Sequence, residues 1–439
     1  MFIKMTNVGA IKEAAVDLTG LSVIAGKNGT GKSTIGKTVY TIIKSIQEQG
    51  NIVEKKKREF IDWVCKNIYF TLQAMISRAE NSGVPSKEDN DLLESHFQLG
   101  AFESPLFQYM DNNDFENASA LVVSRMEMVD KFSNIIDEDT KQKTKEFLRT
   151  IANKLVPMDT KTSLKESLVT MYQNVFEGQI NNLKSHLTSE VDFGNLLKYS
   201  VSNNADTVAF YDRFQIQFVD ENISEKVFQD ATFVETPLLL QMEKVRDTNH
   251  LPTYWRDLLS KVPEKTSLQN DAIRDAISGI SEALGGKLEY NTNKRRFEFI
   301  KKDFNEGANV SVNNVASGEK VLGIFQQLAL NNMFGADKIT ILDEPENHLH
   351  PEWLVILAEV LVKLAIAKCP ILITSHSPDF LQALRFYAKK YGLTQTKFYL
   401  ANSETKTIED KTGKEYEIFD NLAKPINDIF SFSMSEALS

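Results

Sequence analysis

A glycine-rich segment near the start of the chain has the residue types and spacing of a triphosphate-binding loop. Residues 26–34 read GKNGTGKST and fit the pattern G-x-x-x-x-G-K-[ST] without a mismatch. The glycines let backbone N–H groups wrap a polyphosphate, while Lys32 can reach the β- and γ-phosphates and Ser33 can ligate Mg²⁺. The alternative is an ordinary glycine turn with a chance lysine. A strand pattern before the loop and a helical pattern after it favour the phosphate site, because a helix N-terminus adds partial positive charge.

Two adjacent carboxylates follow an apolar segment much later in the chain. Residues 338–342 read KITIL, and Asp343 and Glu344 come directly after them. An aspartate at the end of such a strand can hold the coordination shell of Mg²⁺. The neighbouring Glu344 is placed to polarise a water for attack on a γ-phosphate. Alone, this pattern is only weak evidence for a Mg²⁺ and nucleotide site. It becomes strong evidence because a phosphate loop precedes it in the same chain.

Two further segments could contact phosphate. Residues 371–375 read ILITS and lead into His376, whose imidazole could donate to a γ-phosphate at the strand end. The alternative is a histidine with a structural role. Its position in line with the other motifs favours a contact with phosphate instead. Ser317, Gly318 and Glu319 precede a helical pattern, where small residues and a helix N-terminus suit an anion. Ser317 could instead be an ordinary helix N-cap.

The elements expected to position these residues form an α/β head with a mixed sheet and flanking helices. Strands are predicted within residues 1–25 and at 207–211, 214–218, 231–235, 287–290, 296–300, 338–342, 370–374 and 396–401. Helices are predicted from Ser33 to about Ile46 and at 268–283, 319–333, 351–367 and 378–390. Helical periodicity dominates 47–187. One apolar stripe there is interpreted as core packing, with a partner groove as the alternative: Leu164, Leu168, Met171, Val175, Leu183 and Leu187.

Composition restricts the classes of protein. With 42% hydrophobic and 25% charged residues, the 439-residue chain is typical of a globular protein with more than one unit. The apolar run 353–367 contains Glu359 and Lys363 and reads as a core helix. No targeting peptide is evident, and Cys65 and Cys369 build no disulfide framework, so we expect a cytoplasmic protein and no membrane partner.

The acidic charge of the chain is concentrated in its middle. Residues 51–260 hold 23 Lys and Arg against 33 Asp and Glu, and the remainder holds 27 against 27. Phosphate contacts need clustered cations, so this distribution does not favour a broad nucleic-acid surface, although binding remains possible. The small basic clusters at 55–58 and 294–302 are interpreted as solvated faces.

Together these motifs resemble the ATP-binding-cassette (ABC) ATPases, in the branch of RecF, SMC-type heads and the overcoming-lysogenization-defect (OLD) family. The run from Asp343 to Pro351, DEPENHLHP, is similar to the Walker B and D-loop run of OLD-type and related stand-alone anti-phage defence ATPases of the PtuA or AriA type. The spacing agrees, with 26 residues from Ser317 to Asp343 and 33 from Asp343 to His376. The resemblance covers about residues 1–46, 190–240 and 285–402.

The resemblance implies a role for each matching residue. Glu344 would be the catalytic base and His376 the switch histidine, while Ser33 and Asp343 would hold Mg²⁺. The signature Ser317, Gly318 and Glu319 would cover ATP bound on a second copy, so an ATP-bridged homodimer or larger homo-oligomer is implied. The Walker A residues that would bind the triphosphate are Gly26, Lys27, Asn28, Gly29, Thr30, Gly31, Lys32, Ser33 and Thr34.

The domain organisation expected from this resemblance is an ABC-type P-loop ATPase head interrupted by a large, mostly helical insertion. The segments are 1–46 (N-terminal lobe with Walker A), 47–190 (helical insertion), 191–240 (return strands), 241–285 (helical segment), 286–402 (C-terminal lobe with signature, Walker B and switch histidine) and 403–439 (C-terminal tail).

Three features depart from or compete with this assignment. Val315 and Ala316 stand where the family signature usually has Leu-Ser, so the hydroxyl near a γ-phosphate would come from Ser317. No Q-loop glutamine is evident, and Gln241 is the candidate. His348 and His350 have the spacing of a metal-ligand pair, but their place in the D-loop run is the simpler explanation.

The function expected is that of a slow ATPase that dimerises around ATP and regulates a separate effector in prokaryotic antiviral defence. Only 63 residues follow His376, too few for the Toprim nuclease of many OLD-type proteins, so a nuclease or toxin partner is expected. DNA maintenance of the RecF or SMC type is the alternative. A transporter motor is disfavoured, because the 291 residues between Gly26 and Ser317 far exceed the transporter spacing.

Overall fold

The computed structural model divides the chain into two compact units, Met1–Gln47 with Lys165–Ser439 and Glu48–Leu164. Residues described by the structure are 1–81, 104–106, 108–110, 112, 114–131, 138–155, 160–176, 188–202, 214–219, 227–244, 251–263, 268, 270–294, 296–301 and 309–424. The predicted strand 207–211, Leu183, Leu187 and residues 425–439 of the tail lie outside these ranges. The helices in the described ranges include none with the length and apolar character of a membrane span.

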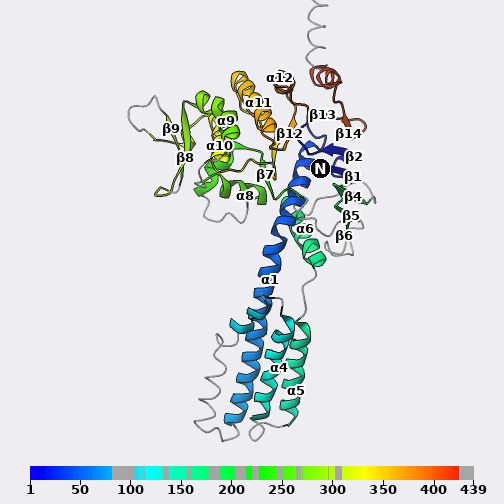
Figure 1. The fold of residues 1–439 in the computed structure, drawn as a ribbon, viewed down its shortest axis with the longest axis vertical. Helices are drawn as coiled ribbons and strands as arrows, with labels where there is room; N and C mark the ends of the chain where they lie inside the picture. The colour runs from blue at the N-terminus through cyan, green and yellow to red at the C-terminus, as the bar shows by residue number, and fades with distance from the viewer. Residues whose placement is uncertain are drawn as a thin grey trace, which may run out of the picture. The chain divides into compact units, whose positions relative to one another are not determined.

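Eleven described strands of the first unit form one mixed sheet (Figure 1), in the order β6-β5-β4-β1-β2-β14-β13-β3-β12-β11-β7. A second, three-stranded sheet has the order β10-β9-β8. The strands are β1 Phe2–Val8, β2 Ile11–Asp17, β3 Leu21–Gly26, β4 Ser189–Phe193, β5 Leu197–Val201, β6 Phe214–Phe218, β7 Asp230–Val234, β8 Gly286–Asn291, β9 Arg296–Lys301, β10 Asn309–Ser311, β11 Lys338–Asp343, β12 Ile371–Ser375, β13 Thr396–Ala401 and β14 Thr407–Asp410.

Parallel pairing brings four strand ends to one edge of the large sheet. β3 pairs with β12, β12 with β11 and β11 with β7, all in parallel register. β3 and β12 are buried at every residue, as expected for parallel strands covered on both faces. Parallel strands share a carboxyl edge, so the phosphate loop, His376, Glu344 and Glu235 all follow strands that end together.

Helices cover this sheet and supply most of the core. α11 packs against α9 and α12, and α10 packs against α9 and β8. α9 begins at the N-cap Asn270, whose side chain accepts hydrogen bonds from two backbone N–H groups, and it ends at Gly285, which adopts a left-handed φ of 55°. The named helices of this unit are the first part of α1, which spans Lys32–Asn81, and α6 Thr160–Phe176, α8 Thr253–Lys261, α9 Asp271–Leu284, α10 Ser317–Leu330, α11 Pro351–Ile366 and α12 Pro378–Lys390, with short 3₁₀ helices η2 Pro237–Lys244 and η5 Val312–Asn314.

The second unit, Glu48–Leu164, is helical throughout its named elements. Its core contains apolar residues of α1, Lys32–Asn81, together with residues of α4, Phe115–Lys131, and α5, Glu138–Lys154. Buried Ile61 and Val64 of α1 share this core with Val122 and Leu148. The helical insertion that we propose over 47–190 includes this unit. In the predicted stripe of α6, the described residues are buried: Leu164, Leu168, Met171 and Val175.

Most predicted elements around the candidate site are confirmed. α12 and β13 have the expected bounds, 378–390 and 396–401, and the other predicted C-terminal elements differ by one to three residues at their ends. The hairpin β4–β5 and the strand β14 were not predicted. The sequence signal for the hairpin was the pair Gly194 and Asn195, because both residues adopt the positive φ of its turn.

A buried ring of four charged side chains connects α1, the helix after the phosphate loop, to β7 and α8. Lys44 Nζ lies 2.6 Å from Asp230 and 2.8 Å from Asp257, and Lys261 Nζ lies 2.8 Å from Asp230 and 2.9 Å from Asp257. Burial alone would raise the pKa of Asp230, but Lys261 and Lys44 reverse this and hold that pKa below its ordinary value. The ring therefore depends on all four partners being present.

We expect Asp230→Ala to lower the free energy of unfolding by about 3–5 kcal/mol, because it leaves two buried ammonium groups with one carboxylate. Denaturant unfolding followed by circular dichroism measures the change. Glu289→Ala is the matched control, since its pair with Lys287 is exposed and should contribute about 0–1 kcal/mol. Equal stability of the two variants would contradict the importance of the ring.

Candidate active site

The phosphate loop closes tightly between β3 and α1. Gly29 and Gly31 have φ values of 76° and 89°, a region that L residues with side chains rarely adopt. A Cβ on Gly31 would also lie 2.7 Å from Ile11, so no side chain fits there. Beside the loop is a cavity of about 530 Å³ lined by Ala10, Asn28, Gly29, Thr30, Gly31, Lys32, Ser33, Thr34, Glu235, Asp343, Glu344 and Asn347.

Lys32 is held within the loop by backbone carbonyls. Its Nζ donates to the carbonyl oxygens of Gly26 at 2.9 Å and Lys27 at 3.0 Å, and lies 3.6 Å from Glu344 Oε1. Burial lowers the pKa of Lys32 below its ordinary value, although Glu344 and Asp343 oppose this effect. An anion in the cavity would compensate for the lost hydration of this ammonium group. Gly26 and Lys27 thus contribute to the site through their carbonyls and do not line the cavity.

The Ser33 hydroxyl and the Asp343 carboxylate come together although they are 310 residues apart. Ser33 Oγ donates to Asp343 Oδ1 at 2.9 Å, and Thr374 Oγ1 donates to the same oxygen. Burial raises the pKa of Asp343, while the two hydroxyl donors lower it. A buried carboxylate beside a serine hydroxyl is an all-oxygen donor set, which is what Mg²⁺ prefers. The residues present therefore fit a Mg²⁺ ion accompanying a bound triphosphate.

Glu344 begins a tight loop after β11. Its φ is 51°, and its backbone N–H donates to the Thr374 carbonyl at 3.0 Å, which fixes the loop to β12. Its side chain is 24% exposed. His376 Nδ1 lies 3.2 Å from Glu344 Oε1, but without the alignment of a hydrogen bond. The predicted base and the predicted switch histidine are thus neighbours at the ends of adjacent strands.

Glu346 binds the end of β12 beside His376, and no role was predicted for it. Its Oε1 accepts hydrogen bonds from Ser375 Oγ at 2.5 Å and from the His376 backbone N–H at 3.1 Å. Burial raises the pKa of Glu346, and the Ser375 hydrogen bond lowers it. This contact fixes the backbone at the end of β12. In the sequence, Glu346 was noted only as part of the Walker B run, and no separate role was predicted for it.

Glu235 is the second residue that sequence reasoning missed. It follows β7, and since Val234 pairs with Leu342, Glu235 comes next to Asp343 at the shared strand edge. Its Oε2 accepts from Trp255 Nε1 at 3.1 Å, and its Oε1 lies 3.6 Å from Lys37 Nζ. The available signal was an acidic residue ending a predicted strand. The Q-loop candidate Gln241 lies in η2 and lines neither described cavity.

The signature residues stand apart from this cavity. α10 begins at Ser317, its N-cap is Ala316, and among the described residues no side chain caps it, so the N-cap interpretation of Ser317 is wrong. A Cβ on Gly318 would lie 3.1 Å from the His348 carbonyl and 3.1 Å from the Trp353 ring. Glu319 Oε1 lies 2.5 Å from Lys301 Nζ. None of the signature residues lines the 530 Å³ cavity.

The His-x-His pair has a structural explanation in part. His350 is the N-cap of α11, where its Nδ1 accepts a hydrogen bond from the Glu352 N–H at 3.3 Å. His348 has a φ of 70° in the preceding loop. Within the described ranges, no group of three or more His, Cys, Asp or Glu side chains could hold a metal ion.

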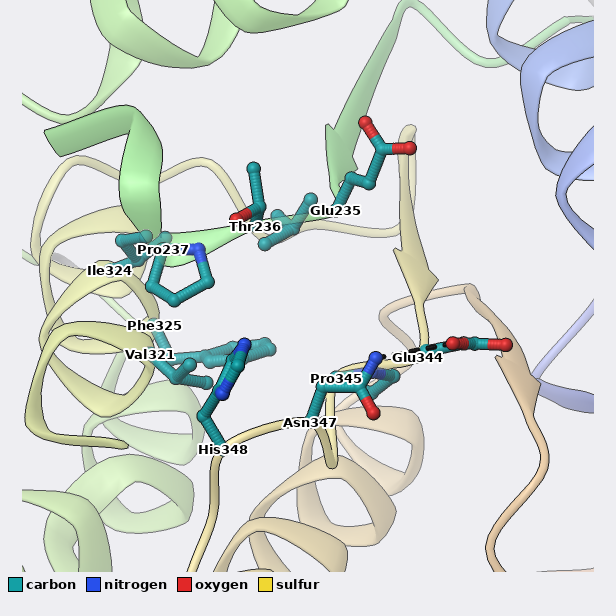
Figure 2. A pocket seen from close by; sticks show the side chains of 11 residues that line it. Glu235, Thr236, Pro237, Val321, Ile324, Phe325, Glu344, Pro345, Asn347 and His348 are labelled. Atoms are coloured by element: carbon teal, nitrogen blue, oxygen red, sulfur yellow. Dashed lines mark hydrogen bonds between the residues drawn. The ribbon is translucent and has the colours of Figure 1, made fainter. Parts of the chain in front are cut away.

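A smaller cavity of about 180 Å³ is lined in part by the loop that begins at Glu344 (Figure 2). It shares Glu235, Glu344 and Asn347 with the larger cavity. The α10 side chains Val321, Ile324 and Phe325 form its apolar wall, and the remaining lining residues are Val234, Thr236, Pro237, Pro345 and His348.

Comparison with known proteins gives a family match over most of the chain. The family described as AAA ATPase domain matches residues 1–381. No curated protein matches the chain. The predicted fold class, an α/β P-loop ATPase head with a mixed sheet, flanking helices and a helical insertion, is confirmed.

Among solved structures, the chain is similar to SMC head domains at low identity. The SMC head from Thermotoga maritima has 9% identity and a TM-score of 0.36, with 93% of this chain and 97% of that chain covered. An SMC head bound to the C-winged helix domain of ScpA has 9% identity and a TM-score of 0.39, with 93% and 95% covered. The Pyrococcus furiosus SMC head with an extended coiled coil, bound to the C-terminal domain of ScpA, has 10% identity and a TM-score of 0.32, with 95% and 98% covered.

Proposed function

This chain belongs to the AAA ATPase domain family, and from this membership we propose that it binds ATP with Mg²⁺ beside Lys32 and hydrolyses it to ADP and phosphate. One observation carries the proposal. Parallel strands β3, β11 and β12 bring a phosphate loop, an Asp-Glu pair and a histidine to the same edge of one sheet. This arrangement combines an anion cradle, an oxygen donor set and a candidate base within one site.

The roles proposed for the residues follow from their positions. The loop N–H groups and Lys32 bind the triphosphate, and Ser33 with Asp343 holds the cation. Bound Mg²⁺ would supply neutralisation of charge on the phosphate oxygens. Glu344 accepts the proton of the attacking water, and His376 donates to the γ-phosphate. Glu235, at the same strand edge, adds a second carboxylate beside Asp343.

We propose that a second copy completes the site. Ser317, Gly318 and Glu319 do not line the nucleotide cavity of their own chain, and within the described part of the chain no side chain caps the start of α10. Such a helix N-terminus suits an anion. ATP bound at Lys32 of one copy would therefore be covered by the α10 N-terminus of the other.

We expect the purified protein to form a dimer when a non-hydrolysable ATP analogue with Mg²⁺ saturates it. Mass photometry with and without the analogue measures the change. Ser317→Arg should bind the analogue normally but stay monomeric, because the bulky cation occupies the proposed contact. A wild-type protein that remains a single chain at saturation would refute the dimer.

We further propose that the ATPase regulates a separate effector, a nuclease or toxin, in prokaryotic antiviral defence. The support is the run from Asp343 to Pro351, which resembles that of OLD-type and related defence ATPases. Neighbouring genes discriminate between the roles. An adjacent nuclease reading frame would support defence, whereas a recombination cluster would favour DNA maintenance.

A further inference from the structure

Asn347 stands between the two cavities of the active site. It lines both of them, and its backbone N–H donates to the Glu344 carbonyl at 3.1 Å. This hydrogen bond closes a turn that starts at the left-handed φ of Glu344. The turn brings the Asn347 side chain back toward the Glu344 carboxylate.

The side chain of Asn347 holds one oxygen of that carboxylate. Its Nδ2 donates to Glu344 Oε2 at 3.1 Å, the contact drawn as a dashed line in Figure 2. The other oxygen, Oε1, lies 3.2 Å from His376 Nδ1 and 3.6 Å from Lys32 Nζ. Neither of these two contacts has hydrogen-bond geometry. One carboxylate oxygen is thus fixed by an amide, and the other lies near the Lys32 ammonium group and the His376 imidazole beside the phosphate loop.

We propose that Asn347 is a positioning residue for hydrolysis, which holds Glu344 Oε2 so that Oε1 is presented to the attacking water. The inference rests on the proposed function, because it assigns Asn347 a role through the base Glu344. A glutamate side chain rotates about three bonds, and a base works only within hydrogen-bond reach of the proton it accepts. Small displacements of a reacting group reduce the rate strongly.

The loop does not depend on the side chain of Asn347. The turn is closed by the backbone N–H of Asn347, which every side chain except proline preserves. The residue is also only half-buried, so the core does not depend on it. A substitution of the side chain therefore removes the contact with Glu344 and retains the loop.

Asn347→Leu has nearly the same size but no donor, and we expect it to reduce kcat by about tenfold to a hundredfold. Affinity for the non-hydrolysable analogue should stay unchanged, because Asn347 acts on the base and not on the phosphates. Asn347→Gln, which retains the amide on a longer arm, should recover part of the lost rate. Glu352→Gln is the control, because Glu352 is exposed in the first turn of α11 and lines neither cavity, so its kcat and its affinity for the analogue should match those of the wild type.

The decisive measurement repeats Asn347→Leu in the Glu344→Gln background. If Asn347 acts through Glu344, its loss should add no further decrease in kcat there. A wild-type rate in Asn347→Leu, or the same fold loss in both backgrounds, would overturn the inference while leaving the ATPase assignment intact. Normal turnover by Glu344→Gln alone would instead overturn the assignment of the base, and this inference with it.

Discussion

Glu344→Gln is expected to bind ATP normally and to lose about 10²–10⁴-fold in hydrolysis rate. Glutamine keeps the size and the polar end of the side chain, but it cannot accept the proton of the attacking water. The other groups of the site remain, including Lys32 and the Ser33–Asp343 pair. Phosphate release under single-turnover conditions measures the chemical step directly. The variant should also accumulate as the ATP-bound dimer, because the nucleotide that holds the copies together is not consumed.

Glu352→Gln is the control for this experiment. Glu352 is exposed in the first turn of α11 and lies outside both cavities. The same chemical change at that position should leave turnover at the wild-type rate. Unimpaired hydrolysis by Glu344→Gln would remove this residue from the role of base.

Lys32→Ala is expected to weaken ATP binding by roughly one to two orders of magnitude. The variant loses the ammonium group that would contact the β- and γ-phosphates. It also leaves the Gly26 and Lys27 carbonyls without the donor that links them across the loop. Titration with a fluorescent ATP analogue measures the affinity.

The control for this loss is Lys12→Ala, which removes an exposed lysine from β2. Its affinity should match that of the wild type, and the melting curves of both variants should show an intact fold. If Lys32→Ala bound ATP as tightly as the wild type, the phosphate loop would not be the nucleotide site.

Much of the site could be predicted because its parts are local in sequence. The loop Gly26–Thr34 carries its own geometry, since its glycines and the helix that follows are contiguous with Lys32 and Ser33. Asp343 and His376 could be placed because each directly follows an apolar strand. The spacing of these motifs then agreed with the resemblance to ABC-type ATPases, and that resemblance implied the mixed sheet.

Other parts of the site depend on contacts between distant residues. Glu235 could be assigned to the site only from the pairing of β7 with β11, because no local sequence pattern determines which strands become neighbours. The hydrogen bond from Asn347 to Glu344 required the left-handed turn after β11. The separation of Ser317 from its own cavity likewise became visible only in the folded chain.

The sequence by itself determined the chemical groups, because a phosphate loop and a strand ending in carboxylates are set by neighbouring residues. Only the tertiary structure decided how these groups combine. Strand order and turn direction place Glu235 beside Asp343, the Asn347 amide on the Glu344 carboxylate, and Glu346 at the backbone N–H of His376. Such pairings result from long-range packing of the whole sheet, which short-range sequence patterns do not encode.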